Sequence, residues 1–92
     1  MADIAIEMIA QGRVQGVGFR YFCQREAVKI GIKGYVENLV NGDVKILTEG
    51  EKELINKYII AIRNNHPYAS VVNLIQKEIP LSGKYRHFSI KI

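Results

Sequence analysis

The segment Gly12–Arg20, with the sequence GRVQGVGFR, has the residue types best suited to binding an anion. Its three glycines, Gly12, Gly16 and Gly18, permit sharp backbone turns that bring N–H groups close to a bound oxyanion. Arg20 ends the segment with a planar fork of donors that matches the oxygens of a phosphate or carboxylate. A helix that starts here would add free N–H groups and the positive end of its dipole. The segment therefore predicts an anion cradle.

The same segment excludes some familiar chemistries. It lacks the Gly-Lys-Ser/Thr ending with which a P-loop holds nucleotide phosphates and Mg²⁺. No HxxxH, CxxC or paired-acid spacing indicates a metal site, so we expect neither a metal nor another cofactor. Cys23 is the only cysteine and falls on the apolar stripe of a helix-like run, where a packed core thiol is expected rather than a nucleophile.

The elements that must position this segment follow from the spacing of apolar residues. Alternation with a period of two predicts strands, and a period near 3.6 predicts helices. A strong hairpin signal, Asn41-Gly42, separates two of the strands, and Gly31 is the expected stop of the first helix. The expected elements are a strand over 4–11, a helix over 19–30, strands over 33–40 and 44–49, a helix from Glu51 that ends at 64–67, and strands over 70–79 and 88–92.

This order, β-α-β-β-α-β with a short C-terminal strand, is that of the ferredoxin-like split βαβ arrangement. We therefore expect an α+β fold of two layers, in which two helices cover one face of an antiparallel sheet. The first helix should make a right-handed crossover, which lets the glycine-rich segment face the second strand. Residues 1–92 are long enough for one hydrophobic core and are expected to form a single domain.

Composition narrows the function classes. Hydrophobic residues make up 48% and charged residues 24% of the chain, which fits a globular domain and argues against disorder. No apolar run approaches the ~18 residues of a membrane span, and the N-terminus has no basic region typical of a secretory signal. A single cysteine favours a reducing cytoplasm. The net charge of +4 suits an anionic partner, although the basic residues are scattered as on an ordinary surface.

Two stretches together point to a known family. Gly12–Arg20 resembles the first signature of the acylphosphatases, G-x-V-Q-G-V-x-F-R. The stretch Gly34–Asn38, followed by Gly42, Val44 and Gly50 at matching spacing, resembles their second signature. The resemblance covers essentially the whole chain. It implies a ferredoxin-like fold and the metal-free hydrolysis of a carboxyl–phosphate anhydride to a carboxylate and inorganic phosphate.

The resemblance also implies roles for individual residues. By position, Arg20 is the phosphate-binding residue and Asn38 holds the attacking water. The backbone amides of the cradle would come from Gln15, Gly16, Val17, Gly18, Phe19 and Arg20. The expected partner is a small-molecule acyl phosphate, with inorganic phosphate as product and competitive ligand. Nucleic acid and membranes are not expected as partners, and a monomer is expected.

Glu37 departs from the family pattern, which usually has a basic residue, Gln, Ala or Met at this position. An acid near an anion site should weaken the attraction for substrate. Because successive strand residues point to opposite faces, Glu37 should point away from the site if Asn38 points into it. Solvent would then screen most of the repulsion.

Other functions remain open at this point. RNA-binding RRM domains share the element order, and Lys33-Gly34-Tyr35 resembles the start of their RNP1 motif. The following residues lack the aromatic pattern, and the third strand, Val44–Glu49, has no aromatic residue. A second alternative is a non-catalytic domain that binds acyl phosphates, as in carbamoyl-transfer proteins. Taken singly, the glycines also fit simple turns, and Arg20 fits a surface ion pair.

Overall fold

The computed structural model describes residues 2–64 and 66–92 and contains every element that the sequence predicts. The difference at the second helix is small: Glu51 ends a strand, so the first helical turn keeps only Glu53 as an acidic residue. The expected helix end at 64–67 includes Asn65, which lies outside the described residues. The elements are β1 (Asp3–Arg13), α1 (Phe19–Ile30), β2 (Lys33–Asn38), β3 (Val44–Glu51), α2 (Lys52–Asn64), β4 (Ser70–Ile79) and β5 (Phe88–Lys91).

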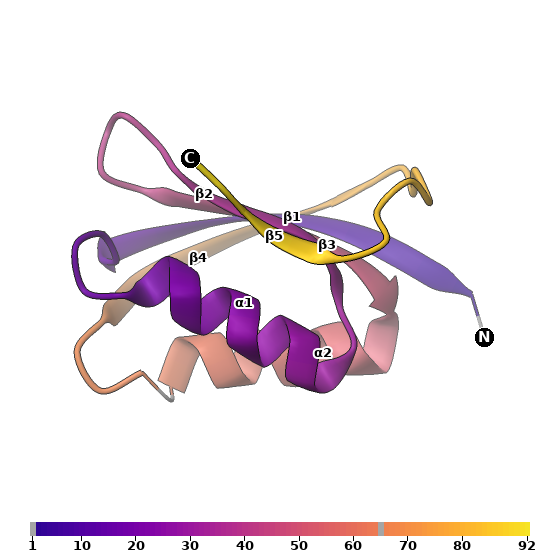
Figure 1. Ribbon diagram of the computed structural model, residues 1–92, viewed down its shortest axis with the longest axis horizontal. Coiled ribbons are helices and arrows are strands. Elements are labelled where there is room, and N and C mark those ends of the chain that lie inside the picture. The colour runs from indigo at the N-terminus through magenta and orange to yellow at the C-terminus, as the bar shows by residue number, and fades with distance from the viewer. Residues whose placement is uncertain (1, 65) are drawn as a thin grey trace.

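The strands form one five-stranded sheet in the order β4-β1-β3-β2-β5, and both helices lie on the same face of it (Figure 1). The ferredoxin-like fold class is therefore confirmed. The pairs β1–β3, β1–β4 and β2–β3 are antiparallel, whereas β5 pairs with β2 in parallel. This departure from a purely antiparallel sheet follows from topology. The chain reverses direction after β4, and β2 already runs opposite to β4, so the returning β5 must run with β2.

The core lies between the sheet and the two helices. Alternate residues of the strands point toward the helices, as Met8, Val36 and Ile46 do, and all three are fully buried. Aromatic residues of the helices fill the space between these strand residues and the helix backbones. The largest fully buried side chains include Tyr58, Phe19, Met8, Ile46, Ile55 and Ile62.

No helix in the described part of the chain is long and apolar enough to cross a membrane.

Cys23 belongs to this core, as the sequence predicts. Its backbone carbonyl accepts a hydrogen bond from the Tyr58 hydroxyl at 2.9 Å, which ties α1 to α2. Burial raises the pKa of the Cys23 thiol, because a thiolate would lose its hydration there. The thiol is therefore kept protonated, in keeping with a packing role.

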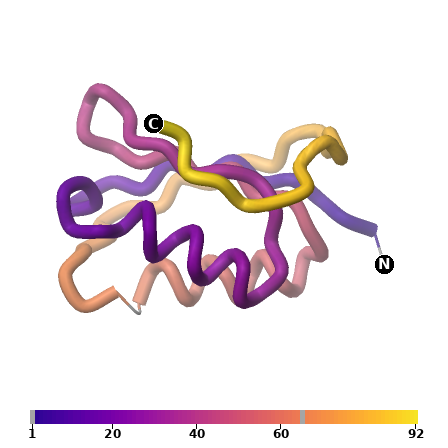
Figure 2. Tube along the Cα trace, in the orientation of Figure 1, coloured from indigo at the N-terminus to yellow at the C-terminus, as the bar shows by residue number. Residues whose placement is uncertain are grey.

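The chain path brings two distant segments together. Figure 2 shows the β1–α1 connection and the β2–β3 hairpin at the same end of the molecule. The connection between β4 and β5, residues 80–87, lies at the opposite end. The first pair of segments carries the two stretches singled out in the sequence, so the fold joins them at one place.

Candidate active site

The backbone φ angle alternates in sign along the β1–α1 connection. Gly16 and Gly18 have φ of 76° and 78°, in the left-handed region, and no described residue other than glycine has a positive φ. Residues 15–18 therefore alternate between negative and positive φ. A run of this kind forms a concave nest of N–H groups, which is a known binding geometry for anions. Val14, just before it, is 1% exposed and anchors the connection in the core.

The start of α1 faces the same space. Gly18 is its N-cap, with φ 78° and ψ 16°, and Phe19 follows as a fully buried first residue. Within the described chain, no side chain caps this helix end and no acidic residue occupies its first turn. The first N–H groups of the helix are thus left for solvent or a ligand, at the positive end of the helix dipole.

Arg20 extends from the first turn of α1 toward β5. Its Nη1 donates a hydrogen bond to the carbonyl oxygen of Lys91 at 3.4 Å. Among residues 2–64 and 66–92, no carboxylate forms an ion pair with Arg20. A cation at a helix N-terminus is disfavoured by the helix dipole. The surface ion pair that the sequence left open is therefore not formed, and the guanidinium keeps donors for an anion.

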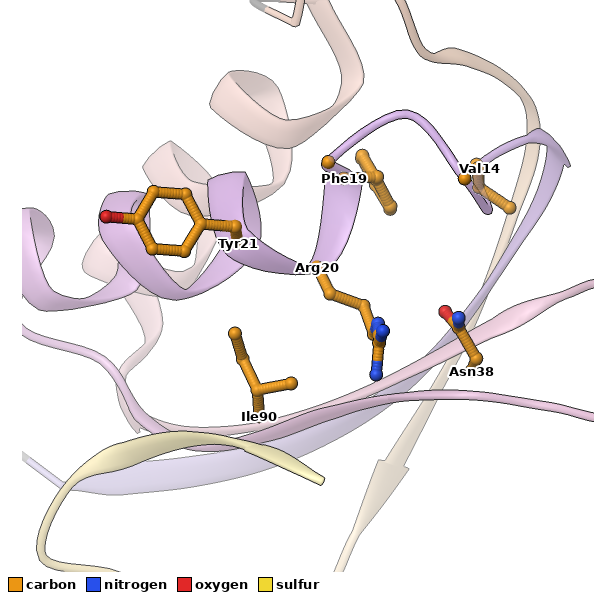
Figure 3. Close-up of a pocket in the computed structure, with 8 residues that line it drawn as sticks. Val14, Phe19, Arg20, Tyr21, Asn38 and Ile90 are labelled. Carbon is orange, nitrogen blue, oxygen red and sulfur yellow. The ribbon is translucent and has the colours of Figure 1, made fainter. Parts of the chain in front are cut away.

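Asn38 is the last residue of β2 and lies opposite Val44 in the ladder with β3. Val36, two residues earlier, is buried beneath the helices, so strand alternation places Asn38 on the helix side of the sheet. Figure 3 shows its side chain directed into the space that the Arg20 guanidinium enters from the other side. The two residues thus meet although they come from different elements.

Glu37 lies on the opposite face of β2, with Tyr35. In the sheet it is level with Lys45 of β3 and with Lys91 of β5. Both lysine ammonium groups also lie over the Tyr35 ring, at 5.7 and 4.0 Å from its centroid. The acid is therefore flanked by two cations on the face away from Asn38.

Residues from the β1–α1 connection, α1, β2 and β5 line one pocket. The segment predicted to bind phosphate contributes Gly16, Gly18, Phe19 and Arg20, and β2 contributes Asn38. Val14, from the same glycine-rich segment although not among the predicted site residues, also lines the pocket, together with Tyr21 and Ile90, which the sequence did not single out. Tyr21 is next to Arg20 in the chain, but nothing local in the sequence places Ile90 here. That placement depends on the pairing of β5 with β2, where Ile90 lies opposite Val36.

The side chains of Gln15 and Val17 do not line this pocket. Val17 packs against the hydrophobic core. The Gln15 side chain turns toward the β2–β3 hairpin, where its Nε2 donates to the carbonyl oxygens of Leu39 and Asp43, each at 2.8 Å. Gln15 thus has a side-chain contact that the signature motif did not indicate. Across the described residues, no cluster of three or more His, Cys, Asp or Glu side chains could hold a metal ion.

Comparison with known proteins places this chain in a family. The acylphosphatase family model matches residues 6–90. The acylphosphatase of Bacillus pumilus is 41% identical over 83 residues, which cover 90% of this chain and 92% of the relative. That of Archaeoglobus fulgidus is 41% identical over 87 residues, covering 95% and 97%.

Solved structures agree with this result. The crystal structure of the acylphosphatase from Bacillus subtilis superposes with a TM-score of 0.92 at 37% identity, covering 97% of this chain and 99% of that one. Full-length HypF, solved in a phosphate- and nucleotide-bound form, contains a similar part. There the TM-score is 0.87 at 30% identity, over 98% of this chain but 12% of HypF.

The chain belongs to the acylphosphatase family, as the two signatures predict. It is accordingly an enzyme that hydrolyses acyl phosphates.

Proposed function

We propose that the chain hydrolyses small acyl phosphates by water attack at phosphorus, with Arg20 and the backbone of Gln15–Arg20 holding the phosphoryl group. Asn38 holds the attacking water. The observation that carries this proposal is the pocket itself, which joins the left-handed glycines, the start of α1, Arg20 and Asn38. The match of the chain to named acylphosphatases over nearly its full length supports the substrate class.

Hydrolysis of an acyl phosphate requires few groups beyond the phosphate donors and a residue that orients the water. The leaving group of an acyl phosphate is a carboxylate, which departs without being protonated. Charge in the transition state is spread over the phosphoryl oxygens, so positioning and electrostatic stabilisation do most of the work. A cradle of N–H groups and the Arg20 guanidinium supply donors that are already oriented, at a site where negative charge accumulates.

Asn38 suits the role of holding water because its amide has both an acceptor and donors and does not titrate. The amide oxygen of Asn38 can accept a hydrogen bond from the water. A lone pair of the water oxygen is then directed at phosphorus. An oxygen of the phosphoryl group takes the proton from the water, so the reaction needs no separate base. Phosphate, as the product, occupies the same donors and competes with substrate.

We also propose that residues 1–92 act as a single domain and as a monomer. Stand-alone acylphosphatases of nearly the same length support the single domain. Size-exclusion chromatography with light scattering tests the second point. A measured mass of twice 10.4 kDa would contradict a monomer.

The test is a phosphate-release assay with acetyl phosphate and benzoyl phosphate, each with and without EDTA. Turnover should survive the chelator. Arg20→Ala should lower kcat/KM about 100-fold or more and weaken inhibition by phosphate. Asn38→Ala should lower kcat by about 100-fold while the Ki of phosphate stays within about threefold.

Two exposed residues outside the pocket serve as matched controls, Arg63→Ala on α2 and Asn73→Ala on β4, and both should behave as wild type. Absence of wild-type hydrolysis, or full activity of Asn38→Ala, would refute the proposed mechanism.

A further inference from the structure

We propose that Gln15 is a positioning residue whose side-chain amide clamps the β2–β3 hairpin to the glycine-rich connection and thereby fixes Asn38 relative to the bound phosphoryl group. The inference rests on the proposed function of Asn38. Besides the backbone N–H that Gln15 contributes to the cradle, its side chain has a role of its own, which depends on two hydrogen bonds.

The clamp uses the full donor capacity of one group. The Gln15 amide nitrogen carries two hydrogens, and the carbonyl oxygens of Leu39 and Asp43 each accept one, both at 2.8 Å. Both contacts are short and partly buried, so water replaces them poorly. One side chain of the β1–α1 connection thus binds both sides of the hairpin turn.

These two carbonyls also close the turn. The N–H of Leu39 donates to the Asp43 carbonyl at 2.8 Å, and the N–H of Gly42 donates to the Leu39 carbonyl at 3.2 Å. The β2–β3 ladder ends just before them, at the pair Asn38–Val44. Asn38 is therefore the last residue held by the sheet, and the turn beyond it projects toward the end of the molecule (Figure 2).

The other end of the clamp is rigid. Val14, the neighbour of Gln15, is 1% exposed and belongs to the hydrophobic core. A second side chain, Gln11 of β1, reaches the hairpin through the Asp43 carboxylate, but that contact is longer, at 3.3 Å. Gln11 also lies on the strand and not in the cradle. Among the side-chain hydrogen bonds of the described residues, those of Gln15 are the ones that join the cradle to the hairpin.

Loss of the clamp should separate two functions of the site. The phosphate donors and Arg20 lie on one continuous segment, which keeps its own anchors in Val14 and Phe19. Asn38 lies across the pocket and would lose its link to that segment. Because a displacement of about 1 Å between reacting groups can reduce a rate as much as 100-fold, turnover should suffer far more than phosphate binding.

The experiment compares Gln15→Met with Gln24→Met. Methionine keeps the length of the side chain and removes the donors. Gln24 offers a matched control because its Nε2 donates to the Phe88 carbonyl at 3.2 Å, between α1 and β5 and outside the pocket lining. We expect Gln15→Met to lower kcat about tenfold with the Ki of phosphate within about threefold, and Gln24→Met to retain wild-type kinetics.

A double-mutant cycle with Asn38→Ala separates positioning from a general effect on the fold. If Gln15 acts through Asn38, Gln15→Met should change kcat by less than about twofold in the Asn38→Ala background. Hydrogen exchange gives a readout that does not depend on activity. The amides of Leu39 and Gly42 should exchange about tenfold faster in Gln15→Met and at the wild-type rate in Gln24→Met.

Wild-type turnover by Gln15→Met, additive losses in the cycle, a Ki that rises in step with the fall in kcat, or unchanged exchange at Leu39 would each overturn the clamp. These results differ from failure of the proposed function, which would appear as full activity of Asn38→Ala. If Gln15→Met does not fold at the assay temperature, Gln15→Asn replaces it in the same measurements, since its amide ends one methylene short of the carbonyls.

Discussion

The carboxylate of Glu49 accepts hydrogen bonds from both the backbone N–H and the hydroxyl of Ser82, at 3.0 and 2.8 Å. Its other oxygen accepts a third bond from the N–H of Gly83, at 3.1 Å. Glu49 is 5% exposed and lies on the sheet face opposite the helices. The contact holds the connection between β4 and β5 against that face, where Tyr85 also packs on Tyr35.

Removal of this contact should destabilise the fold and spare the active site. Glu49→Gln keeps the shape of the side chain but replaces an acceptor with a donor that faces other donors. We expect the free energy of unfolding to fall by about 2–3 kcal/mol, measured by urea denaturation, with kcat within about twofold of wild type. Glu78→Gln on the exposed part of β4 is the control and should change neither quantity. Equal stability of Glu49→Gln and wild type would contradict this account.

A second prediction concerns the close approach of β2 and β3 at Gly34. Its φ is 138°, and a Cβ atom there would lie 1.8 Å from the Leu47 carbonyl oxygen. Gly34→Ala must therefore push β2 away from β3, and we expect a loss of about 3 kcal/mol or more in unfolding free energy. Because β2 carries Asn38, turnover should fall as well.

Gly50→Ala is the matched control for that change. Gly50 lies on β3 just beyond its ladder with β2, where it pairs with Ile4 of β1. The nearest atom to its added Cβ is in the Ile32 side chain at 3.4 Å, an ordinary contact. Its thermal unfolding midpoint should stay close to that of wild type. A Gly34→Ala variant as stable as Gly50→Ala would show that the strand spacing can relax freely.

The Cys23 thiol gives a third prediction. Burial raises its pKa, so both access and thiolate formation are blocked in the folded state. The native protein should react with DTNB at a negligible rate at pH 8 and release one equivalent of chromophore after denaturation in guanidinium. Treatment of the native enzyme with iodoacetamide should leave its activity intact. Rapid native labelling with loss of activity would indicate that the thiol is accessible near the site.

The elements were predictable because each follows from its own local period. The apolar alternation of β1, the helical spacing that begins at Phe19 and the Asn41–Gly42 turn are all short-range signals. The parallel pairing of β5 was not predictable in this way, since it depends on where the chain returns after β4. The end of β3 was also missed, because Glu51 suits a helix start as well as a strand end.

The residues of the candidate site likewise fall into those that a local pattern predicts and those that long-range contacts place. Arg20 and Asn38 follow from two signatures, and the fold brings them to one pocket. Ile90 and the Gln15 clamp depend on long-range contacts that carry no local pattern. A glutamine in a glycine-rich segment fits solvent exposure as well as a contact to a distant carbonyl, so its sequence context cannot separate the two.

The last prediction addresses Glu37, whose charge departs from the family pattern. It lies on the sheet face away from the pocket, level with Lys45 and Lys91, and solvent screens what remains of its field. Glu37→Gln should therefore raise kcat/KM less than about twofold at an ionic strength of about 0.15 M. Tyr21→Glu, which puts an acid on the exposed rim of the pocket, should instead raise the Ki of phosphate about fivefold or more. A large gain in Glu37→Gln would mean that the charge acts through the sheet on bound substrate.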